Sequence, residues 1–220
     1  LDVGQGFSSF VRAGNGICIL IDGGGFGSGS SFDTGRNIIA PFLWHTGVRQ
    51  IDCMILTHPE ADHLNGLVYI AENFKVNMLV KTVDTNPSPE YRSLMKACRE
   101  KDIRVIHPGP GPLPLPGSPA SILFFNSMKA RDGLNNRSLV FKILSKGFSV
   151  LVTGDILASR EKRLAVEYGR QLHADVLIAA HHGSRSSSCH FFLDKVQPES
   201  VIVPCGWQNR YGFPHASVLE

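Results

Sequence analysis

The sequence has none of the long apolar runs or leader features that mark a membrane-embedded or secreted chain. No stretch of about 18 uninterrupted apolar residues occurs, so nothing within these residues is expected to span a bilayer as a helix. The N-terminus carries no secretory signal. It opens at Leu1-Asp2-Val3-Gly4, without Met and in a strand-like pattern. We therefore expect the chain to be a fragment of a longer protein.

Cysteine and excess charge are also scarce. The five cysteines are dispersed and form no Cys-x-x-Cys pair, which does not fit a disulfide framework. Cys18 and Cys53 fall in apolar strand patterns and are expected to be packing residues. The net charge of +3 is weak evidence for a polyanionic partner. A chain of 220 residues makes one large domain or two small ones, ample for a buried core, and of these we expect a single domain over residues 1–220.

Short apolar runs separated by turn residues predict a mixed α/β chain. Strands are predicted over residues 7–11, 17–21, 53–56, 77–81, 103–106, 121–125, 138–144, 148–153, 176–180 and 200–203. Helices are predicted over residues 36–45, 63–73, 89–101, 160–172 and 187–196. This order favours two sheets with helices on the outside over one doubly wound parallel sheet.

Three connecting segments are rich in Gly, Pro or Asn. Gly14-Asn15-Gly16 predicts a type I′ hairpin turn. The Gly/Ser-rich loop over residues 22–31 either approaches a ligand closely or is mobile, and its residues favour neither interpretation. Residues 108–119 are dense in Pro and Gly and are predicted to form a loop.

One predicted buried strand, residues 53–56, ends in a cluster of ionisable residues. His58, Glu60, Asp62 and His63 follow it directly. Such groups are costly to bury unless they are paired or bind a cation. His58 could instead cap a turn, and Asp62 could cap a helix. Two imidazoles and a carboxylate at one strand end nevertheless match half of a metal site.

Other predicted strand ends carry the same kind of residue. Asp22 follows residues 17–21, Asp155 follows 148–153, and His181-His182 comes at the end of 176–180. With His58, four strand ends carry polar residues, and burying them would cost free energy unless they found partners. We therefore expect these groups to meet at one edge around a cation.

The residues around these strand ends resemble known motifs. Residues 57–66, Thr-His-Pro-Glu-Ala-Asp-His-Leu-Asn-Gly, resemble the His-x-His-x-Asp-His metal motif of the metallo-β-lactamase superfamily, and Thr153-Gly-Asp155 resembles its bridging-aspartate strand. Together with four further segments, the whole chain resembles the metallo-β-lactamase-like domain of the ComEC family of competence proteins. The four segments are residues 1–6, 135–139, 180–184 and 209–215.

This resemblance implies a fold, a parent protein and an activity. The fold would be an αββα sandwich of two mixed sheets with helices on their outer faces. The parent would be a bacterial inner-membrane DNA-uptake channel, with this domain soluble on the outer, periplasmic side. The activity would be metal-dependent hydrolysis of the DNA strand that is not transported. Single-stranded DNA and the channel portion of the parent would be the partners, and no organic cofactor is expected.

The resemblance also implies residue roles. The expected metal ligands are His58, Asp62, His63, Asp155 and His182, of which Asp62, Asp155 and His182 would also be catalytic. The expected substrate contacts are His181, Asn136, Arg137, Arg210 and His215, with Arg185 as a further phosphate contact. Asp22 and Glu60 would lie beside the ligands in roles that stay open. His182 is preferred over His181 as the late ligand, because the family's ligand precedes a small residue and Ser.

Two positions depart from the family pattern. Glu60 stands where the superfamily usually has a second His, so the first of two metal sites is expected to be weak. An amide oxygen of Asn135 or Asn136 could assist it. Fewer imidazoles and more oxygen ligands favour Mn²⁺, with Zn²⁺ possible. Phe213 replaces a His that is often found in the family.

Two other functions remain open at this level. The same scaffold hosts hydrolases of other phosphodiesters and esters. The domain could also have lost its first metal and guide DNA as a module of the channel. Metal content and activity on DNA distinguish these alternatives.

Overall fold

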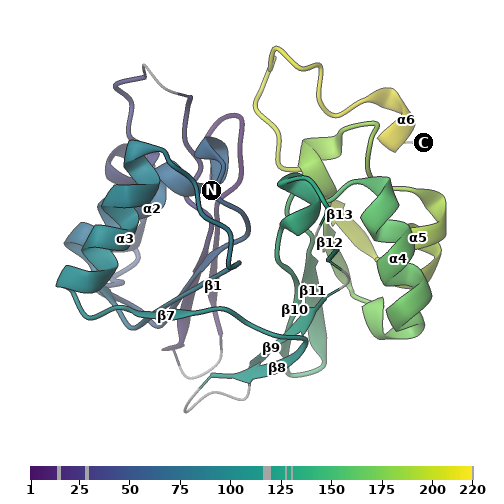
Figure 1. The fold of residues 1–220 in the computed structure, drawn as a ribbon, viewed down its shortest axis with the longest axis horizontal. Coiled ribbons are helices and arrows are strands. Elements are labelled where there is room, and N and C mark those ends of the chain that lie inside the picture. Colours follow the sequence, from purple (N-terminus) through teal and green to yellow (C-terminus); the bar gives the residue numbers. More distant parts are fainter. Residues whose placement is uncertain (14–15, 28–29, 116–119, 127, 130, 220) are drawn as a thin grey trace. The chain divides into compact units, whose positions relative to one another are not determined.

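The computed structural model describes residues 1–13, 16–27, 30–115, 120–126, 128–129 and 131–219. The chain forms two compact units (Figure 1): unit 1 spans Leu1–His107, and unit 2 spans Pro108–Glu220. Among the described residues, no helix is long and apolar enough to cross a membrane. The expected Asn15-Gly16 turn falls partly outside the described residues.

Unit 1 contains strands and helices in alternation. Its strands are β1 (Ser9–Arg12), β2 (Cys18–Ile21), β3 (Gln50–Ile51), β4 (Cys53–Leu56), β5 (Lys75–Val76), β6 (Met78–Lys81) and β7 (Arg104–Ile106). Its helices are the π-helical η2 (Gly35–Ile39), α1 (Ala40–His45), α2 (Ala61–Asn73) and α3 (Pro89–Glu100). β3 and β5, which the apolar pattern did not predict, form a separate parallel pair.

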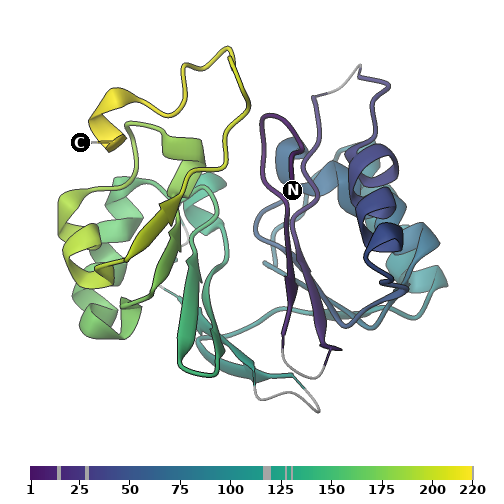
Figure 2. The same cartoon turned by 180° about the vertical axis from the view of Figure 1, so that it is seen from behind.

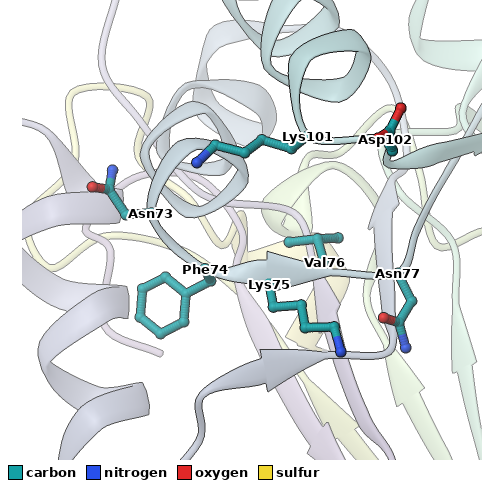
Figure 3. A pocket seen from close by; sticks show the side chains of 7 residues that line it. All are labelled: Asn73, Phe74, Lys75, Val76, Asn77, Lys101 and Asp102. Atoms are coloured by element: carbon teal, nitrogen blue, oxygen red, sulfur yellow. The ribbon is translucent and has the colours of Figure 1, made fainter.

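The main sheet of unit 1 has the order β1-β2-β4-β6-β7. β1 and β2 form an antiparallel hairpin, visible in Figure 2, and β2, β4, β6 and β7 run parallel. Parallel strands are buried on both faces, which explains why Cys53–Leu56 is apolar throughout instead of alternating. Because β2 and β4 are parallel neighbours, the residues that follow them emerge at the same edge of the sheet.

The helices of unit 1 cover one face of this sheet (Figure 1). Leu67 and Ile70 of α2 and Leu94 of α3 share one hydrophobic core with Met54 and Leu56 of β4. Cys18 and Cys53 are buried, as predicted, and burial raises the pKa of the Cys53 thiol to about 12.

The first residues of the Gly-rich loop pack against a helix; its approach to a ligand and its mobility both stay predictions. Gly23 donates to His63 O at 2.6 Å, and Gly66 donates to Gly24 O at 3.2 Å, so the loop packs backbone to backbone against α2. A Cβ at Gly66 would lie 2.1 Å from Gly23 O, so only glycine allows this approach. The contact fixes the first turns of α2 beside the end of β2. Ser28 and Gly29 lie outside the described residues.

Unit 2 is built around a second sheet. Its strands are β8 (Gly111–Pro114), β9 (Ser121–Phe125), β10 (Val140–Ser145), β11 (Phe148–Val152), β12 (Val176–Ile178) and β13 (Ser200–Ile202). Its helices are α4 (Ala158–Tyr168), α5 (His190–Val196) and α6 (Ala216–Leu219), with 3₁₀ turns η3 (Asn135–Arg137), η4 (Gly169–Leu172) and η5 (Ala180–Gly183).

The sheet of unit 2 has the order β13-β12-β11-β10-β9-β8. β8 to β11 pair antiparallel, and β11, β12 and β13 pair parallel. Leu164 of α4 and Phe192 of α5 pack in one core with Leu151 of β11 and Leu177 of β12. The expectation of two mixed sheets with flanking helices is confirmed.

β8 corrects the prediction of a loop over residues 108–119. Gly111–Pro114 pairs antiparallel with β9, and Leu113 lies opposite Ile122. β8 is the edge strand of its sheet, where proline is tolerated because one side of the strand needs no donor. Residues 116–119 lie outside the described part of the chain.

Candidate metal centre

In unit 1 the ionisable residues lie at the carboxyl edge of the parallel strands. Asp22 follows β2 and His58 follows β4, and Asp22 N donates to Ile55 O at 2.8 Å. Asp62 and His63 stand in the first turn of α2, which begins two residues earlier than predicted. Asp22, His58 and His63 are buried, whereas Asp62 is half-buried.

The Asp22 carboxylate organises this cluster. Its Oδ1 accepts from Thr57 N at 2.7 Å, and its Oδ2 accepts from Thr57 Oγ1 at 2.6 Å. His63 Nδ1 lies 2.7 Å from the same Oδ2. A carboxylate only accepts, so His63 carries its proton on Nδ1 and its Nε2 holds a lone pair. A carboxylate behind an imidazole is the usual support of a metal-binding histidine.

Through Thr57, Asp22 also determines which ring nitrogen of His58 carries the proton. Its hydroxyl proton is directed to Asp22, so its oxygen can accept from His58 Nδ1, 3.1 Å away. His58 then also holds its lone pair on Nε2. The rings of His58 and His63 lie with centroids 4.2 Å apart. One buried aspartate therefore sets the tautomers of two neighbouring histidines, and no spacing rule in the sequence pointed to Thr57.

Glu60 lies next to His58 of this cluster. Its Oε2 is 3.8 Å from His58 Nε2, and its side chain is 39% exposed. The carboxylate that replaces the family's imidazole thus faces the candidate ligand His58 and does not point away from it.

In unit 2 the parallel strands carry a second set of residues. Asp155 follows β11 and His182 follows β12, and these strands are parallel neighbours. His182 Nδ1 lies 2.8 Å from Pro204 O, which follows β13. A carbonyl only accepts, so Nδ1 is protonated, and in the neutral ring Nε2 holds the lone pair. That Nε2 lies 3.3 Å from Asp155 Oδ2, and both residues are buried.

The backbone of unit 2 is strained at this point. His181 and His182 have φ values of 52° and 57°, in the left-handed region that non-glycine residues rarely adopt. Each such residue costs about 1–3 kcal/mol and persists where the surroundings enforce it, most often at functional sites. Gly183 follows with φ 78°, and a Cβ there would lie 2.7 Å from Pro214. The turn is held against the chain that follows β13.

A buried arginine holds the segment that contacts the backbone of Asp155. Arg160 of α4 donates through Nη1 to Asn136 O at 2.7 Å and Ser138 O at 2.5 Å. Ser138 Oγ in turn accepts from Asp155 N at 3.2 Å. Arg160 is fully buried, and burial lowers the pKa of its guanidinium to about 10. Nothing in the sequence singles out this residue, because the pattern predicts only one of several charges on an amphipathic helix.

The expected substrate contacts differ in their surroundings. Asn136 accepts from Leu157 N at 2.9 Å and donates to Ser159 Oγ at 3.1 Å, so its amide holds the start of α4. A substrate contact by Asn136 stays a prediction. His181 lies between Ser186 Oγ and Asn135 Nδ2, at 3.3 and 3.4 Å.

The remaining expected contacts lie nearer to solvent. Arg185 and Arg210 are exposed, and Arg137 and His215 are half-buried. His215 Nδ1 accepts from Arg185 N at 3.2 Å, and His215 N donates to Gly183 O at 3.0 Å. His215 is thereby tied to the turn that carries His182.

The chemistry of these residues fits a divalent cation. In unit 2, a lone pair on His182 Nε2 faces a carboxylate oxygen of Asp155. Two such electron-rich atoms repel each other unless a proton or a cation lies between them. In unit 1, two oriented imidazoles stand beside Asp62 and Glu60. Imidazole with carboxylate is a donor set of Zn²⁺ and, as oxygen ligands increase, of Mn²⁺.

Comparison with known proteins identifies the family of this chain. The family model described as metallo-beta-lactamase superfamily matches residues 1–207. The chain belongs to the metallo-β-lactamase superfamily. Proteins of this superfamily bind divalent metals, which agrees with the donor sets above. Among solved structures, the diiron β-hydroxylase CmlA of Streptomyces venezuelae shares the fold at 18% identity. Its TM-score is 0.58, over 90% of this chain and 43% of that one.

The metallo-β-lactamase domain also matches competence proteins along its whole length. It is 33% identical to ComE operon protein 3 of Bacillus subtilis, covering 100% of this chain and 30% of the relative. It is 30% identical to competence protein ComA of Neisseria gonorrhoeae, covering 99% of this chain and 28% of that protein. The resemblance to competence proteins is confirmed. The chain spans under a third of the length of these relatives.

Proposed function

We propose that this metallo-β-lactamase domain hydrolyses the phosphodiester backbone of DNA with bound divalent metal. The proposed ligands are His58, Asp62 and His63 in unit 1, and Asp155 and His182 in unit 2. One observation supports this above the others: the lone pair of His182 Nε2 lies 3.3 Å from the Asp155 carboxylate in a buried setting. A bound divalent ion would lower the pKa of a water molecule and neutralise charge on the phosphate.

The residues of the chain prepare this chemistry. Asp22 and the Pro204 carbonyl orient the rings of His63 and His182 through their Nδ1 atoms. Arg160 and Ser138 fix the backbone that carries Asp155. Such preorganisation reduces the reorganisation that metal binding and reaction would otherwise require.

DNA as substrate is supported by the relatives and by the position of the arginines. Of two relatives that match nearly the whole chain, one is named competence protein ComA and the other ComE operon protein 3. Arg185 and Arg210 are exposed within the segments that follow β12 and β13. Arginine is a common contact for backbone phosphate. We place the domain on the periplasmic side of the inner membrane, as part of a longer DNA-internalisation protein that degrades the strand left outside.

The metal requirement tests the proposal directly. Chelator-treated protein should not cleave single-stranded DNA, and Mn²⁺ should restore more activity than Zn²⁺ or Mg²⁺. Oxygen ligands around His58 favour Mn²⁺ over the softer Zn²⁺, and the imidazole ligands favour Mn²⁺ over Mg²⁺, which prefers oxygen ligands alone. Full cleavage in chelator would contradict the proposal. Hydrolysis of a small phosphodiester without any cleavage of DNA would instead favour a phosphodiesterase with another substrate.

A DNA-guiding module without catalysis is the second candidate. It is favoured by Glu60, whose carboxylate lies 3.8 Å from His58 Nε2 where the family usually has an imidazole. A metal-depleted domain of this kind would bind single-stranded DNA but cleave it with none of the three ions. Metal content measured in the same samples separates this result from a failure to load the site.

A further inference from the structure

The segment between β13 and α6 exposes aromatic side chains. Trp207 is 91% exposed, and Tyr211 is 49% exposed. Large aromatic rings dominate the energetics of interfaces, so an indole that contacts so little of its own protein marks a binding surface. Trp207 makes no contribution to the core of unit 2.

The rings of this segment form a column that leads to His182. The Arg210 guanidinium lies 4.9 Å from the Tyr211 ring centroid. Tyr211 stacks on Phe213 with centroids 5.4 Å apart and ring planes 17° apart. Phe213 stacks on His182 at 6.3 Å and 27°. Stacked planar groups therefore run without interruption from an exposed arginine to a candidate metal ligand.

The two sequence segments that supply the column contain no acidic residue. No Asp or Glu occurs between Ser200 and Leu219, or between Val176 and Leu193. The exposed Arg185 and Arg210 belong to these two segments, and Arg185 is linked to His215 through its backbone. Cations without intervening carboxylates attract a polyanion.

We propose that residues 205–215 form a base-stacking platform for single-stranded nucleic acid. The proposal rests on the proposed hydrolysis of DNA and specifies how the strand is held. Trp207 stacks on one unpaired base, and Tyr211 stacks on another as the Arg210 guanidinium moves from its ring to the backbone phosphate. The column directs the adjoining phosphate towards His182. Only a single strand exposes base faces to such rings. A membrane surface or a protein partner would not require the column to end at a candidate ligand.

Tryptophan fluorescence reports on this platform directly. The only other tryptophan, Trp44, lies on α1 in unit 1 and is replaced in the variant Trp44→Phe. In that variant, with chelator present to prevent cleavage, oligothymidine should quench the emission of Trp207. An abasic strand of the same length carries the same phosphates without bases and should quench far less. Equal quenching by both strands would overturn the proposal, as would an absence of quenching by either.

Affinity measurements on further variants complete the test. Stacking of one base on an aromatic ring is worth about 5- to 150-fold in affinity, so Trp207→Ala and Tyr211→Ala should each weaken oligothymidine binding by that factor. Binding of the abasic strand should not change. Phe148→Ala is the matched control, because Phe148 is 53% exposed but lies at the amino end of β11, whereas residues 205–215 follow the carboxyl end of the parallel strand β13.

The outcomes separate this inference from the proposed hydrolysis. If DNA is cleaved and both aromatic variants bind oligothymidine like wild type, the platform is wrong and the nuclease stands. If the variants lose binding but no metal supports cleavage, the platform stands and the nuclease is wrong. If Trp207 emission shifts with anionic lipid vesicles and not with oligothymidine, the surface belongs to a membrane and the inference is overturned.

Discussion

Replacing Asp22 by Asn would test how one buried carboxylate prepares two histidines. Asp22 accepts three hydrogen bonds, two from Thr57 and one from His63 Nδ1. Asn has nearly the same shape but only one acceptor oxygen. In either orientation of its amide, the NH₂ group must face a hydrogen-bond donor that the Asp22 carboxylate now pairs with.

The expected effects follow from these contacts. A buried donor left without an acceptor costs about 1–3 kcal/mol, so Asp22→Asn should lower the free energy of unfolding by that amount. His63 is no longer held with its proton on Nδ1, and the hydroxyl of Thr57 no longer has to point away from His58. Loss of such support behind a metal ligand typically lowers metal affinity by about 10- to 100-fold.

Isothermal titration calorimetry with Mn²⁺ and Zn²⁺ measures the affinity, and denaturant unfolding measures the stability. Asp52→Asn is the matched control, because Asp52 lies at the other end of β4 and accepts from Cys18 N at 2.9 Å. It should lose stability without losing metal affinity. Thr57→Val keeps the Asp22–His63 contact and removes the hydroxyl that links Asp22 to His58, so its loss of metal affinity should be smaller. A folded Asp22→Asn protein with wild-type metal affinity would refute the reasoning.

Three further predictions concern single residues. Glu60→His should raise Zn²⁺ affinity, because an imidazole would replace a carboxylate that faces His58; unchanged calorimetry would mean that position 60 does not reach the ion. Arg160→Met should lower the free energy of unfolding by about 3 kcal/mol or more, since two buried carbonyls lose charged donors; a loss under 1 kcal/mol in urea unfolding would contradict this. Desolvation raises the pKa of the buried Glu161 carboxyl, so its stabilising contribution is present below the ordinary pKa and is lost as pH rises through the folded-state pKa. Unfolding measured against pH should show this decline in wild type and not in Glu161→Gln.

The strand ends could be predicted because apolar runs followed by charge are a local signal. Asp22, His58 and Asp155 each follow a strand that the sequence predicted, and parallel pairing brings the first two to one edge. The prediction works because burial of both faces of a parallel strand leaves a continuous apolar run. The residue that follows such a run is easily recognised.

Features that depend on contacts between distant segments could not be predicted. The pairing of β8 depends on its partner β9, and its proline content alone predicts a loop. The hydroxyl of Thr57 gains its role only from the position of Asp22, which is 35 residues away. The left-handed backbone of His181 and His182 lies in a turn that packs, at Gly183, against Pro214 in the chain after β13, and the local sequence does not reveal that contact.

The most direct test of the central claim is the metal bound per molecule, together with DNA cleavage, in wild type and Asp155→Ala. Elemental analysis after loading with Mn²⁺ should show bound metal in wild type and its loss in the variant, along with loss of cleavage. Asp194→Ala, which changes an exposed carboxylate on α5, should behave like wild type. Metal-dependent cleavage of DNA by Asp155→Ala at the wild-type rate would contradict the account.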